Sequence, residues 1–430
     1  MQKRTIQVEE KVPILQGIPL SFQHLFAMFG ASVLVPYLLN EAAGKQVINP
    51  ALVLLLNGIG TLIYLFVCKG KAPAFLGSSF AYIAPAIYVI KSSNDVGINF
   101  SRALGGFIVS GLIFISVAFL VGIIGTKWLD IVLPPAAMGP IVALIGLELA
   151  GVAADMAGLL PKDGAYNMDH VIVSIVTLSS VIIASLVFRG FLAIIPVLFA
   201  VIVGYIVSLI LGIVDTTVVT NQPVLAFPDM VLPSFDISAI LTIVPATLVV
   251  LSEHIGHLLV TSNIVDKDLT KEPGLHRSLF GDGFSTMLSG FAGSVPTTTY
   301  GENMGVMAIT RVYSVWVIGG AAIISIIISF FGVLSGAISS IPRPVMGGIS
   351  ILLFGVIAAS GIRMIVEKKV DYSKSRNLIL TAVIFVVGLS GITINLGNVP
   401  LRGMALATVT GMVLSLLFYV LERLRLTNDA

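Results

Sequence analysis

Long apolar runs follow one another along the whole chain and are separated by short stretches rich in Gly, Pro and charged residues. An apolar run of about 18 residues or more is long enough to cross the hydrocarbon core of a bilayer as a helix. The pattern predicts fourteen membrane segments, at residues 16–39, 49–68, 80–91, 102–125, 131–153, 168–188, 191–213, 237–262, 276–293, 301–312, 314–336, 344–364, 376–395 and 403–422.

Two of these segments, 80–91 and 301–312, are too short to cross alone as helices. Each follows an extended stretch of small residues, at 73–80 and at 293–301. The two stretches can pair as short antiparallel strands, each leading into a half-helix, the third and the tenth segment. Seven segments precede the second half, which therefore enters the membrane from the opposite side. This predicts a 7+7 inverted repeat, in which paired interrupted helices mark the substrate site.

Composition agrees with an all-α polytopic membrane protein. Hydrophobic residues make up 57% and charged residues 11% of the 430 residues, whereas soluble domains carry about 25% charged residues. An outer-membrane barrel is excluded, because its strands would appear as alternating segments of about 10 residues. No cleaved signal peptide is expected. Cys68 is the single cysteine, which excludes an internal disulfide and a Cys-based metal site.

The positions of the basic residues predict the orientation. When loops are assigned alternately to the two sides, 18 of the 24 Lys and Arg residues fall on the side of the N-terminus. Cytoplasmic loops carry the excess of positive charge. Both termini are therefore expected in the cytoplasm of a multi-pass protein in the cell membrane. The net charge of +2 gives no indication of nucleic-acid binding.

The half-helices place polar groups where a ligand can reach them. A helix N-terminus offers unpaired N–H groups and a partial positive charge, and here Phe80 and Gly301 occupy these positions. We interpret the two interrupted segments as a binding site. The alternative is a pair of re-entrant loops with a packing role.

Segment eight carries Glu253 and His257, which are four residues apart and share one helix face, whereas His254 points elsewhere. Charged groups inside membrane helices are functional by default. The partner expected for Glu253 is the substrate, with His257 as a titratable neighbour. A structural Glu–His hydrogen bond and a metal site that also includes His254 and Glu302 are the alternatives. The order of these residues does not give the helical metalloprotease geometry.

The acceptors and donors together match a nucleobase. Glu253 and Glu302 are two facing acceptors, and the backbone amides at Phe80 and Gly301 are two donors. A planar ring that alternates N–H and C=O groups, as uracil does, satisfies both sets, and Phe80 or Tyr300 could stack on its face. Residue types alone do not separate uracil from thymine, xanthine or 5-substituted analogues.

Further polar residues lie inside the apolar segments. Gln23, His24, Ser79 and Asn303 are possible lining residues of the site, although Gln23 and His24 could equally satisfy a neighbouring backbone. Glu148 lies outside the predicted site region. It could line the outward path or sit near the interface on that side, and its role stays open. Asp282 could pair with a cytoplasmic base or join a proton path.

A ten-residue signature follows the second extended stretch: an acid, then Asn-x-Gly, four residues and Thr-Arg, here Glu302-Asn303-Met304-Gly305 and Thr310-Arg311. With this signature the whole chain resembles the nucleobase–ascorbate transporters, also called nucleobase:cation symporters. The Gln23-His24 pair is a second shared feature. Residues 19–30, 77–80 and 253–257 resemble the bacterial uracil permeases of that family in particular.

The resemblance implies a core domain and a gate domain. Segments 1–4 (14–125) and 8–11 (236–336) would form the core, and segments 5–7 (126–235) and 12–14 (337–430) the gate. Family members resemble elevator transporters and are often homodimers through their gate domains.

The resemblance also assigns roles to residues of the site. Glu253 and Glu302 would contact the nucleobase, Phe80 and Gly301 would offer backbone amides beside Tyr300, and His257 would take part in proton coupling.

The expected function is uracil:proton symport, without enzymatic activity and without a cofactor or metal. The partners are uracil, protons and membrane lipid. Proton uptake by Glu253 and His257 would remove net charge from the loaded site and lower the cost of crossing an apolar gate. A purine or xanthine permease of the same family, an anion transporter of the same architecture, a membrane metalloenzyme and a channel are the alternatives. Glu302 argues against an anion as substrate, because it would repel one.

Overall fold

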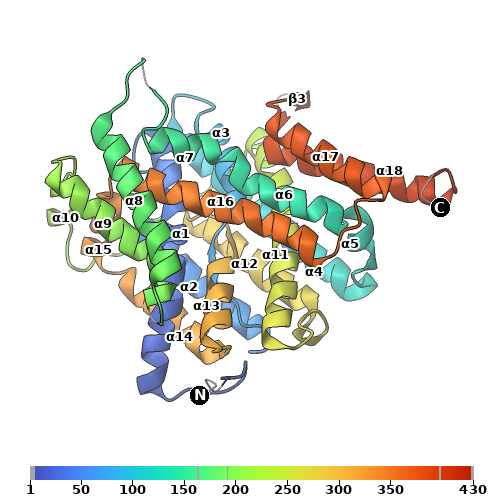
Figure 1. Cartoon of the computed structure of the whole chain (residues 1–430), viewed down its shortest axis with the longest axis horizontal. Coiled ribbons are helices and arrows are strands. Elements are labelled where there is room, and N and C mark those ends of the chain that lie inside the picture. Colours follow the sequence, from blue (N-terminus) through green and yellow to red (C-terminus); the bar gives the residue numbers. More distant parts are fainter. Residues whose placement is uncertain (1–4, 162–163, 191, 397–398, 428–430) are drawn as a thin grey trace.

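The computed structural model describes residues 5–161, 164–190, 192–396 and 399–427. Lys3, Arg4 and Lys162, which enter the charge count, lie outside these ranges, as does residue 191, where one predicted segment begins. Within them the chain folds into helices and two small pairs of strands (Figure 1).

The helices of the first half are α1 (Ile14–Ala43), α2 (Pro50–Val67), η1 (Phe80–Tyr82), α3 (Ile83–Ile90), α4 (Val96–Ile124), α5 (Lys127–Val132), α6 (Pro135–Glu148), α7 (Ala150–Met156), α8 (Met168–Val187), η2 (Leu192–Ile194), α9 (Pro196–Ile210) and α10 (Thr217–Thr220). Those of the second half are α11 (Ile237–Val265), η3 (Thr270–Gly274), α12 (Leu275–Ala292), α13 (Gly301–Thr310), α14 (Val315–Ile328), α15 (Gly332–Ser339), α16 (Arg343–Glu367), α17 (Ser375–Leu389) and α18 (Gly403–Arg423).

Every predicted membrane segment overlaps one of these helices. In the described chain, eight helices are long and apolar enough to cross a membrane. The protein is thus a polytopic helical membrane protein, as composition predicts.

Two predicted segments differ from the structure at their C-terminal ends. The segment 314–336 is broken, because α14 ends at Ile328 and the chain then bonds to the loop before α11, with Gly332 N–H donating to the Val224 carbonyl at 3.1 Å. The segment 376–395 ends early, at Leu389. Gly391 takes a left-handed φ of 73°, and a hairpin of β3 (Thr393–Leu396) and β4 (Val399–Arg402) follows. The apolar runs predict neither of these helix ends, because hydropathy does not distinguish a helix from a loop or a hairpin.

Side-chain caps fix where several long helices begin. Asn49 accepts from Ala51 N–H at 2.9 Å at the start of α2, and Asp236 accepts from Ala239 N–H at 2.9 Å at the start of α11. Asp95 accepts from two amides of the first turn of α4, both at 3.1 Å. Each cap satisfies amides that the helix leaves unpaired.

Glycines bring helices from the two halves of the chain together. A Cβ on Gly111 of α4 would lie 2.6 Å from the Gly283 carbonyl oxygen of α12, and one on Gly361 of α16 would lie 2.4 Å from the Gly139 carbonyl oxygen of α6. Small residues permit this close approach where apolar lipid gives helices no hydrophobic reason to associate. Two packed groups result, one around α4 and α12 with α1, α2, α11 and α14, the other around α6 and α16 with α8, α17 and α18.

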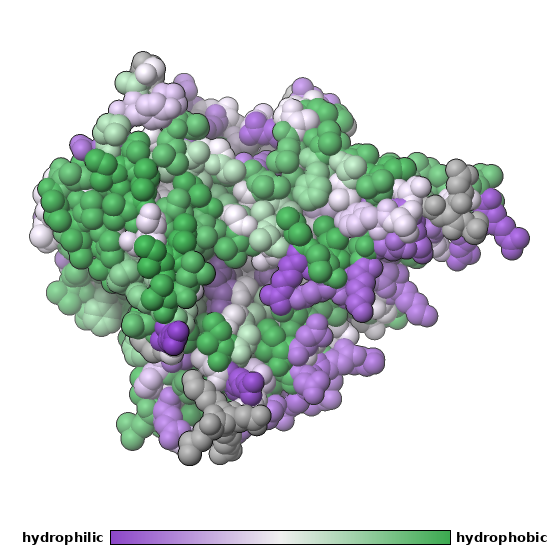
Figure 2. All heavy atoms as spheres, in the orientation of Figure 1, coloured by the Kyte–Doolittle hydropathy of each residue, from purple (hydrophilic) through white to green (hydrophobic). Residues whose placement is uncertain are grey.

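The outer surface is largely apolar. Figure 2 shows hydrophobic side chains over the face formed by α8, α9 and α10 and hydrophilic ones along the lower right edge. The exposed residues of α8 and α9 include Ile175, Ile183, Leu186, Ile202, Ile206 and Ile210. Exposed apolar side chains gathered on one face suit contact with lipid.

Candidate functional site

The two extended stretches pair at the centre of the molecule, as predicted. Strands β1 (Leu76–Ser78) and β2 (Thr297–Thr299) run antiparallel with Gly77 opposite Thr298, and every residue of both is buried. Backbone bonds continue the ladder at both ends, Ser79 N–H to the Pro296 carbonyl at 2.9 Å and Tyr300 N–H to the Phe75 carbonyl at 3.0 Å. The strands lead directly into η1–α3 and α13.

Two threonines hold the strands in the same way. Thr61 of α2 accepts from Leu76 N–H at 2.9 Å and donates to the Leu76 carbonyl at 3.4 Å. Thr286 of α12 accepts from Thr297 N–H at 3.1 Å and donates to the Thr297 carbonyl at 3.1 Å. Each hydroxyl thus satisfies both backbone groups of the first residue of its strand, which would otherwise be unpaired in an apolar interior.

A cavity of about 350 Å³ lies where α13 begins, between the two groups of helices. It is lined from one group by Phe80, by Glu253 and His257 of α11 and by the residues at the start of α13, and from the other by α16 and Val142 of α6. Six of the predicted site residues line this single cavity: Phe80, Glu253, His257, Tyr300, Gly301 and Glu302.

The two carboxylates lie at the cavity, and one of them contributes an unsatisfied acceptor. Glu253 and Glu302 are half-buried and come from different elements, α11 and the first turn of α13. Glu253 Oε2 is buried and has no hydrogen-bond partner among the described residues. A buried acceptor without a partner is costly. The cavity therefore favours a ligand with N–H donors.

His257 faces the same cavity in a defined tautomer. Its Nδ1 lies 2.8 Å from the Thr299 carbonyl oxygen. A carbonyl can only accept, so Nδ1 carries hydrogen. The neutral ring then presents an unprotonated Nε2, which lies 3.8 Å from the position that a Cβ on Gly301 would take. Nε2 can accept a proton beside the start of α13.

The rings of the two aromatic residues are held by different contacts. The Tyr300 ring covers Gly77, where an added Cβ would lie 2.3 Å from it, and its hydroxyl donates to the Ser78 carbonyl at 3.0 Å. The Phe80 ring packs edge-on against Phe354 of α16, with ring centroids 6.0 Å apart. Of the two stacking candidates, the geometry favours Phe80.

The four possible lining residues lie behind the cavity and do not line it. Asn303 donates to the His24 carbonyl at 3.0 Å and thereby ties α13 to α1. Ser79 and His24 are fully enclosed, and Gln23 Oε1 is buried without a partner in the described chain. The His24 ring contacts the Asn303 side chain, with Nδ1 3.1 Å from Asn303 Nδ2, and the backbone group that is satisfied here is the carbonyl of His24 itself.

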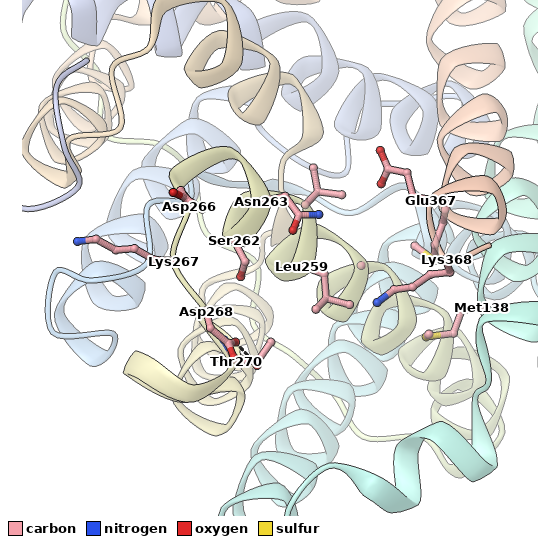
Figure 3. A pocket seen from close by; sticks show the side chains of 13 residues that line it. Met138, Leu259, Ser262, Asn263, Asp266, Lys267, Asp268, Thr270, Glu367 and Lys368 are labelled. Carbon is pink, nitrogen blue, oxygen red and sulfur yellow. Dashed lines mark hydrogen bonds between the residues drawn. The ribbon is translucent and has the colours of Figure 1, made fainter. Parts of the chain in front are cut away.

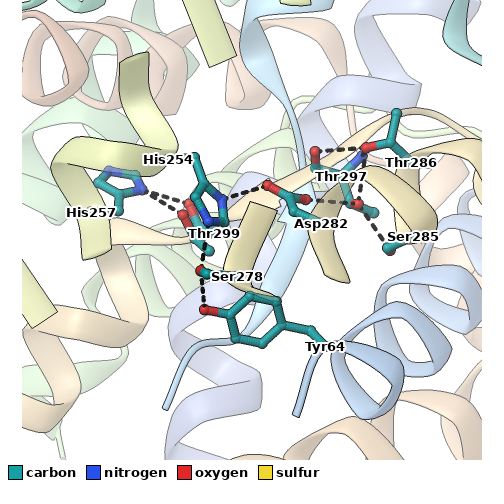
Figure 4. Close-up of polar contacts among 9 residues, drawn as sticks. All are labelled: Tyr64, His254, His257, Ser278, Asp282, Ser285, Thr286, Thr297 and Thr299. Carbon is teal, nitrogen blue, oxygen red and sulfur yellow. Dashed lines mark hydrogen bonds and ion pairs between the residues drawn. The ribbon is translucent and has the colours of Figure 1, made fainter. Parts of the chain in front are cut away.

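Hydrophobic periodicity does not indicate the partner of Asp282. The carboxylate lies 2.8 Å from His254 Nδ1, and His254 Nε2 lies 2.7 Å from the Ser278 hydroxyl (Figure 4). Asp282 therefore pairs with a buried histidine and not with a cytoplasmic base. The one signal in the sequence is that His254 follows Glu253 directly and so points to another face. In the described ranges, no three His, Cys, Asp or Glu side chains converge as metal ligands.

The cavity opens toward a wider recess. This recess, of about 600 Å³, shares Gly256, Val260, Met364 and Glu367 with the cavity. Figure 3 shows its mixed charges, with Asp266, Lys267 and Asp268 on one wall and Glu367 and Lys368 on the other. A polar ligand can therefore reach the carboxylates from the side of these charged residues.

Contacts between the helix groups close the opposite side. The Arg402 guanidinium lies 4.7 Å from the centre of the Tyr88 ring, and Arg343 Nε lies 2.8 Å from Glu41 Oε1. Glu148 accepts from Met404 N–H at 2.9 Å, at the start of α18. Glu148 thus supports the beginning of α18.

The fold is shared with solved membrane transport proteins. The structure matches the murine solute carrier 26 family member A9 anion transporter in the inward-facing state, with a TM-score of 0.72 at 11% identity, covering 96% of this chain and 69% of that one. It also matches the transmembrane domain of the cyanobacterial bicarbonate transporter BicA, with a TM-score of 0.59 at 17% identity, covering 96% and 98%. At such identities the likeness shows the fold alone.

Sequence comparison gives the family. The sequence model of a protein family described as "Permease family" matches residues 15–397 of this chain. The uracil permease of Escherichia coli (strain K12) is 59% identical over 99% of this chain and 96% of its own length. That of Paenibacillus larvae is 54% identical over 100% of both chains. The chain belongs to this permease family, the nucleobase–ascorbate transporters, as its signature predicts.

Proposed function

We propose that the protein is a secondary active transporter that imports uracil together with a proton. The observation that carries this proposal is that Glu253, Glu302, Phe80 and Gly301 line one cavity. In the proposed site the two carboxylates are the acceptors, and the backbone amides at Phe80 and Gly301 are the donors. The relatives named uracil permease, at 59% and 54% identity, support the choice of substrate.

The ligand geometry follows from the edge pattern of the ring. The two N–H groups of uracil donate to Glu253 and Glu302, and its carbonyl groups accept from the amides at Phe80 and Gly301. A carboxylate as acceptor makes these bonds charge-assisted and therefore stronger. Phe80 covers one face of the ring.

The coupling proton binds at Glu253 and His257. His257 Nδ1 donates to the Thr299 carbonyl, so the incoming proton takes Nε2 or the unpartnered Glu253 Oε2. A proton on Glu253 removes the charge of this carboxylate, and a proton on His257 makes the Glu253–His257 pair neutral overall. Either change lowers the desolvation cost of moving the loaded cavity past apolar α16.

Topology and orientation are part of the proposal. Fourteen segments form a 7+7 inverted repeat, which the matching threonine contacts of Thr61 and Thr286 support. Both termini are cytoplasmic by the distribution of Lys and Arg. The recess beside Lys267 and Lys368 then opens to the cytoplasm, so the structure corresponds to an inward-open state.

Transport follows an elevator-like movement of a core domain (14–125 and 236–336) against a gate domain (126–235 and 337–430). The separate packing of the α4–α12 group and the α6–α16 group supports this division. The protein forms homodimers through the gate domains.

An anion is the second candidate substrate, favoured by the fold shared with anion transporters. Glu302 in the first turn of α13 opposes it, because a fixed carboxylate repels an anion at the helix N-terminus that would otherwise bind it. A purine or xanthine substrate remains the alternative within the family.

Reconstituted protein tests the proposal. Proteoliposomes with an imposed pH gradient, acid outside, are expected to accumulate radiolabelled uracil above equilibrium, and unlabelled uracil is expected to compete better than xanthine or bicarbonate. Accumulation that ignores the gradient would remove the proton from the mechanism. Preferential competition by xanthine or bicarbonate would replace uracil.

A further inference from the structure

The pair His254–Asp282 lies behind α11, on the side away from the cavity, and both side chains are 0% exposed. Desolvation largely offsets the Coulomb attraction of a buried ion pair, so stability gives little reason for placing one there. Ionisable groups at membrane depth commonly belong to proton or ion paths. The transport site described above makes no use of this pair.

A chain of hydroxyls connects His254 with α2. His254 Nε2 lies 2.7 Å from Ser278 Oγ, and Ser278 Oγ lies 2.8 Å from the Tyr64 hydroxyl (Figure 4). Tyr64 stands one turn before the end of α2 at Val67. By the distribution of basic residues this end faces the cytoplasm, where Lys69 and Lys71 follow.

Two protonation states of His254 are equally well hydrogen-bonded. In the charged state, Nδ1–H donates to Asp282, Nε2–H donates to Ser278 and the Ser278 hydroxyl donates to Tyr64. In the neutral state, Nδ1–H still donates to Asp282, whereas Tyr64 donates to Ser278 and Ser278 donates to Nε2. Hydroxyl groups serve as donor or acceptor alike, so neither state leaves a ring nitrogen unsatisfied.

The proton transfer that converts the charged state into the neutral state conserves the number of protons. Nε2 gives its proton to Ser278 Oγ, the hydroxyl hydrogen of Ser278 passes to the Tyr64 oxygen, and the hydroxyl hydrogen of Tyr64 leaves toward the end of α2. One proton is lost from the ring and one leaves at Tyr64, while both hydroxyl groups remain intact.

Strand β2 connects the pair with the cavity. Thr297 Oγ1 donates to Asp282 Oδ1 at 3.3 Å, and two residues along the same strand the Thr299 carbonyl accepts from His257. Asp282 and His257 thus hold the two ends of a three-residue strand that leads into α13. A change in the charge of the pair alters the contact that fixes one end of β2.

The surroundings of the pair supply few competing charges. Titratable groups of the described chain that interact with the pair or its hydroxyl chain are Tyr64 and Cys68 on α2 and its cap, Tyr82 on η1, and Glu253 and His257 on α11. Arg277 on α12 interacts with Cys68. From α4, the Phe114 ring packs edge-on against His254 at 6.3 Å.

We propose that His254 and Asp282 form a second proton-holding site of the transporter, which exchanges its proton with the cytoplasmic side through Ser278 and Tyr64 and communicates with the cavity through β2. The inference rests on the proposed proton-coupled transport. It assigns to His254 a role in coupling, without contact to the nucleobase.

The experiment separates coupling from binding in proteoliposomes. The variants are His254→Gln and Asp282→Asn, with His276→Gln on the same helix α12 as Asp282 as the matched control. Counterflow of radiolabelled uracil without a pH gradient measures binding and movement of the site. Accumulation under a gradient of about one pH unit, about tenfold for a one-proton symporter, measures coupling.

Both variants are expected to keep counterflow within about twofold of the control, in keeping with an intact site, and to lose accumulation above equilibrium. Normal accumulation by both would overturn the proposal. An equal loss of counterflow and accumulation in folded protein would also overturn it, because that result assigns the pair a structural role. Wild-type protein without uracil counterflow would contradict the proposed function instead.

Tyr64→Phe tests the hydroxyl chain with little risk to folding, since it removes one oxygen atom. Gradient-driven uptake is expected to slow by about tenfold or more, the range of a lost proton-transfer group, while counterflow stays unchanged. An unaltered gradient-driven rate would show that protons do not pass through Tyr64.

Discussion

At the residue scale, the cavity combines side chains that the sequence places far apart. Glu253 and Glu302 come from α11 and α13, and both line it with His257. Their helical spacing and the half-helix position were sufficient to select all three from the sequence. The partner of Asp282 was not accessible in this way, because a 28-residue separation gives no periodic signal.

Glu302→Gln should weaken uracil binding by about 10- to 100-fold, since a charge-assisted hydrogen bond contributes about 1.5–3 kcal/mol and the new amide presents a donor to the N–H of the ring. Equilibrium binding of radiolabelled uracil to purified protein measures the change. Glu422→Gln, whose carboxylate pairs with Arg376 far along the chain, is the matched control. Equal affinity in both variants would contradict the two-acceptor site.

Comparing Tyr300→Phe with Phe80→Ala tests which of the two aromatic residues stacks on the nucleobase. The hydroxyl of Tyr300 is bonded to Ser78, so its loss should lower stability by about 1 kcal/mol and leave uracil affinity within about twofold. Phe80→Ala should reduce affinity by about tenfold or more, because the stacking face is lost. Thermal unfolding and binding isotherms give the two readouts. A larger loss of affinity in Tyr300→Phe than in Phe80→Ala would reverse the assignment.

At the element scale, the pairing of β1 with β2 is the feature that creates the half-helices. The small residues of both stretches predicted the strands, and their register is seen only in the structure. Thr61 and Thr286 have no distinctive sequence pattern, since a threonine in an apolar helix usually bonds within its own helix. Their common role becomes visible only when each strand lies beside its helix.

Thr61→Val and Thr286→Val should destabilise the protein by similar amounts, about 1–3 kcal/mol each, because each leaves a buried strand amide without its partner. Thr408→Val is the control, since its hydroxyl donates only to the Met404 carbonyl of the same helix, at 2.7 Å. Thermal unfolding in detergent measures the shifts. A large effect in one variant and none in the other would argue against equivalent roles in an inverted repeat.

At the scale of the whole molecule, the cavity is open on one side and closed on the other by contacts between the two groups of helices. Arg343 bonds to Glu41 of α1 across the groups and to Asp155 of α7 within its own group. Breaking the first contact alone should favour opening on that side, because the conformation seen in the structure loses a stabilising interaction and a conformation open on that side does not.

Glu41→Gln should therefore slow labelling of a Ser360→Cys reporter in the cavity, from the side of the recess, by about two- to fivefold, because a partly exposed ion pair contributes at most about 1 kcal/mol. Asp155→Asn, which alters the pair within one group, is the control. Cys68 is buried and should react little. Equal labelling rates in the two variants would show that the Glu41 contact does not bias the conformation.

The sequence by itself determined the class of protein, the positions of the helices and most of the lining of the cavity. It did so because the cost of unpaired polar groups in lipid imposes long apolar helices and makes each interruption conspicuous. Only the tertiary structure decided the register of the strands, the early ends of α14 and α17, and the pairing of His254 with Asp282. These features depend on contacts between segments far apart in the chain, and hydropathy, a local property, carries no record of them.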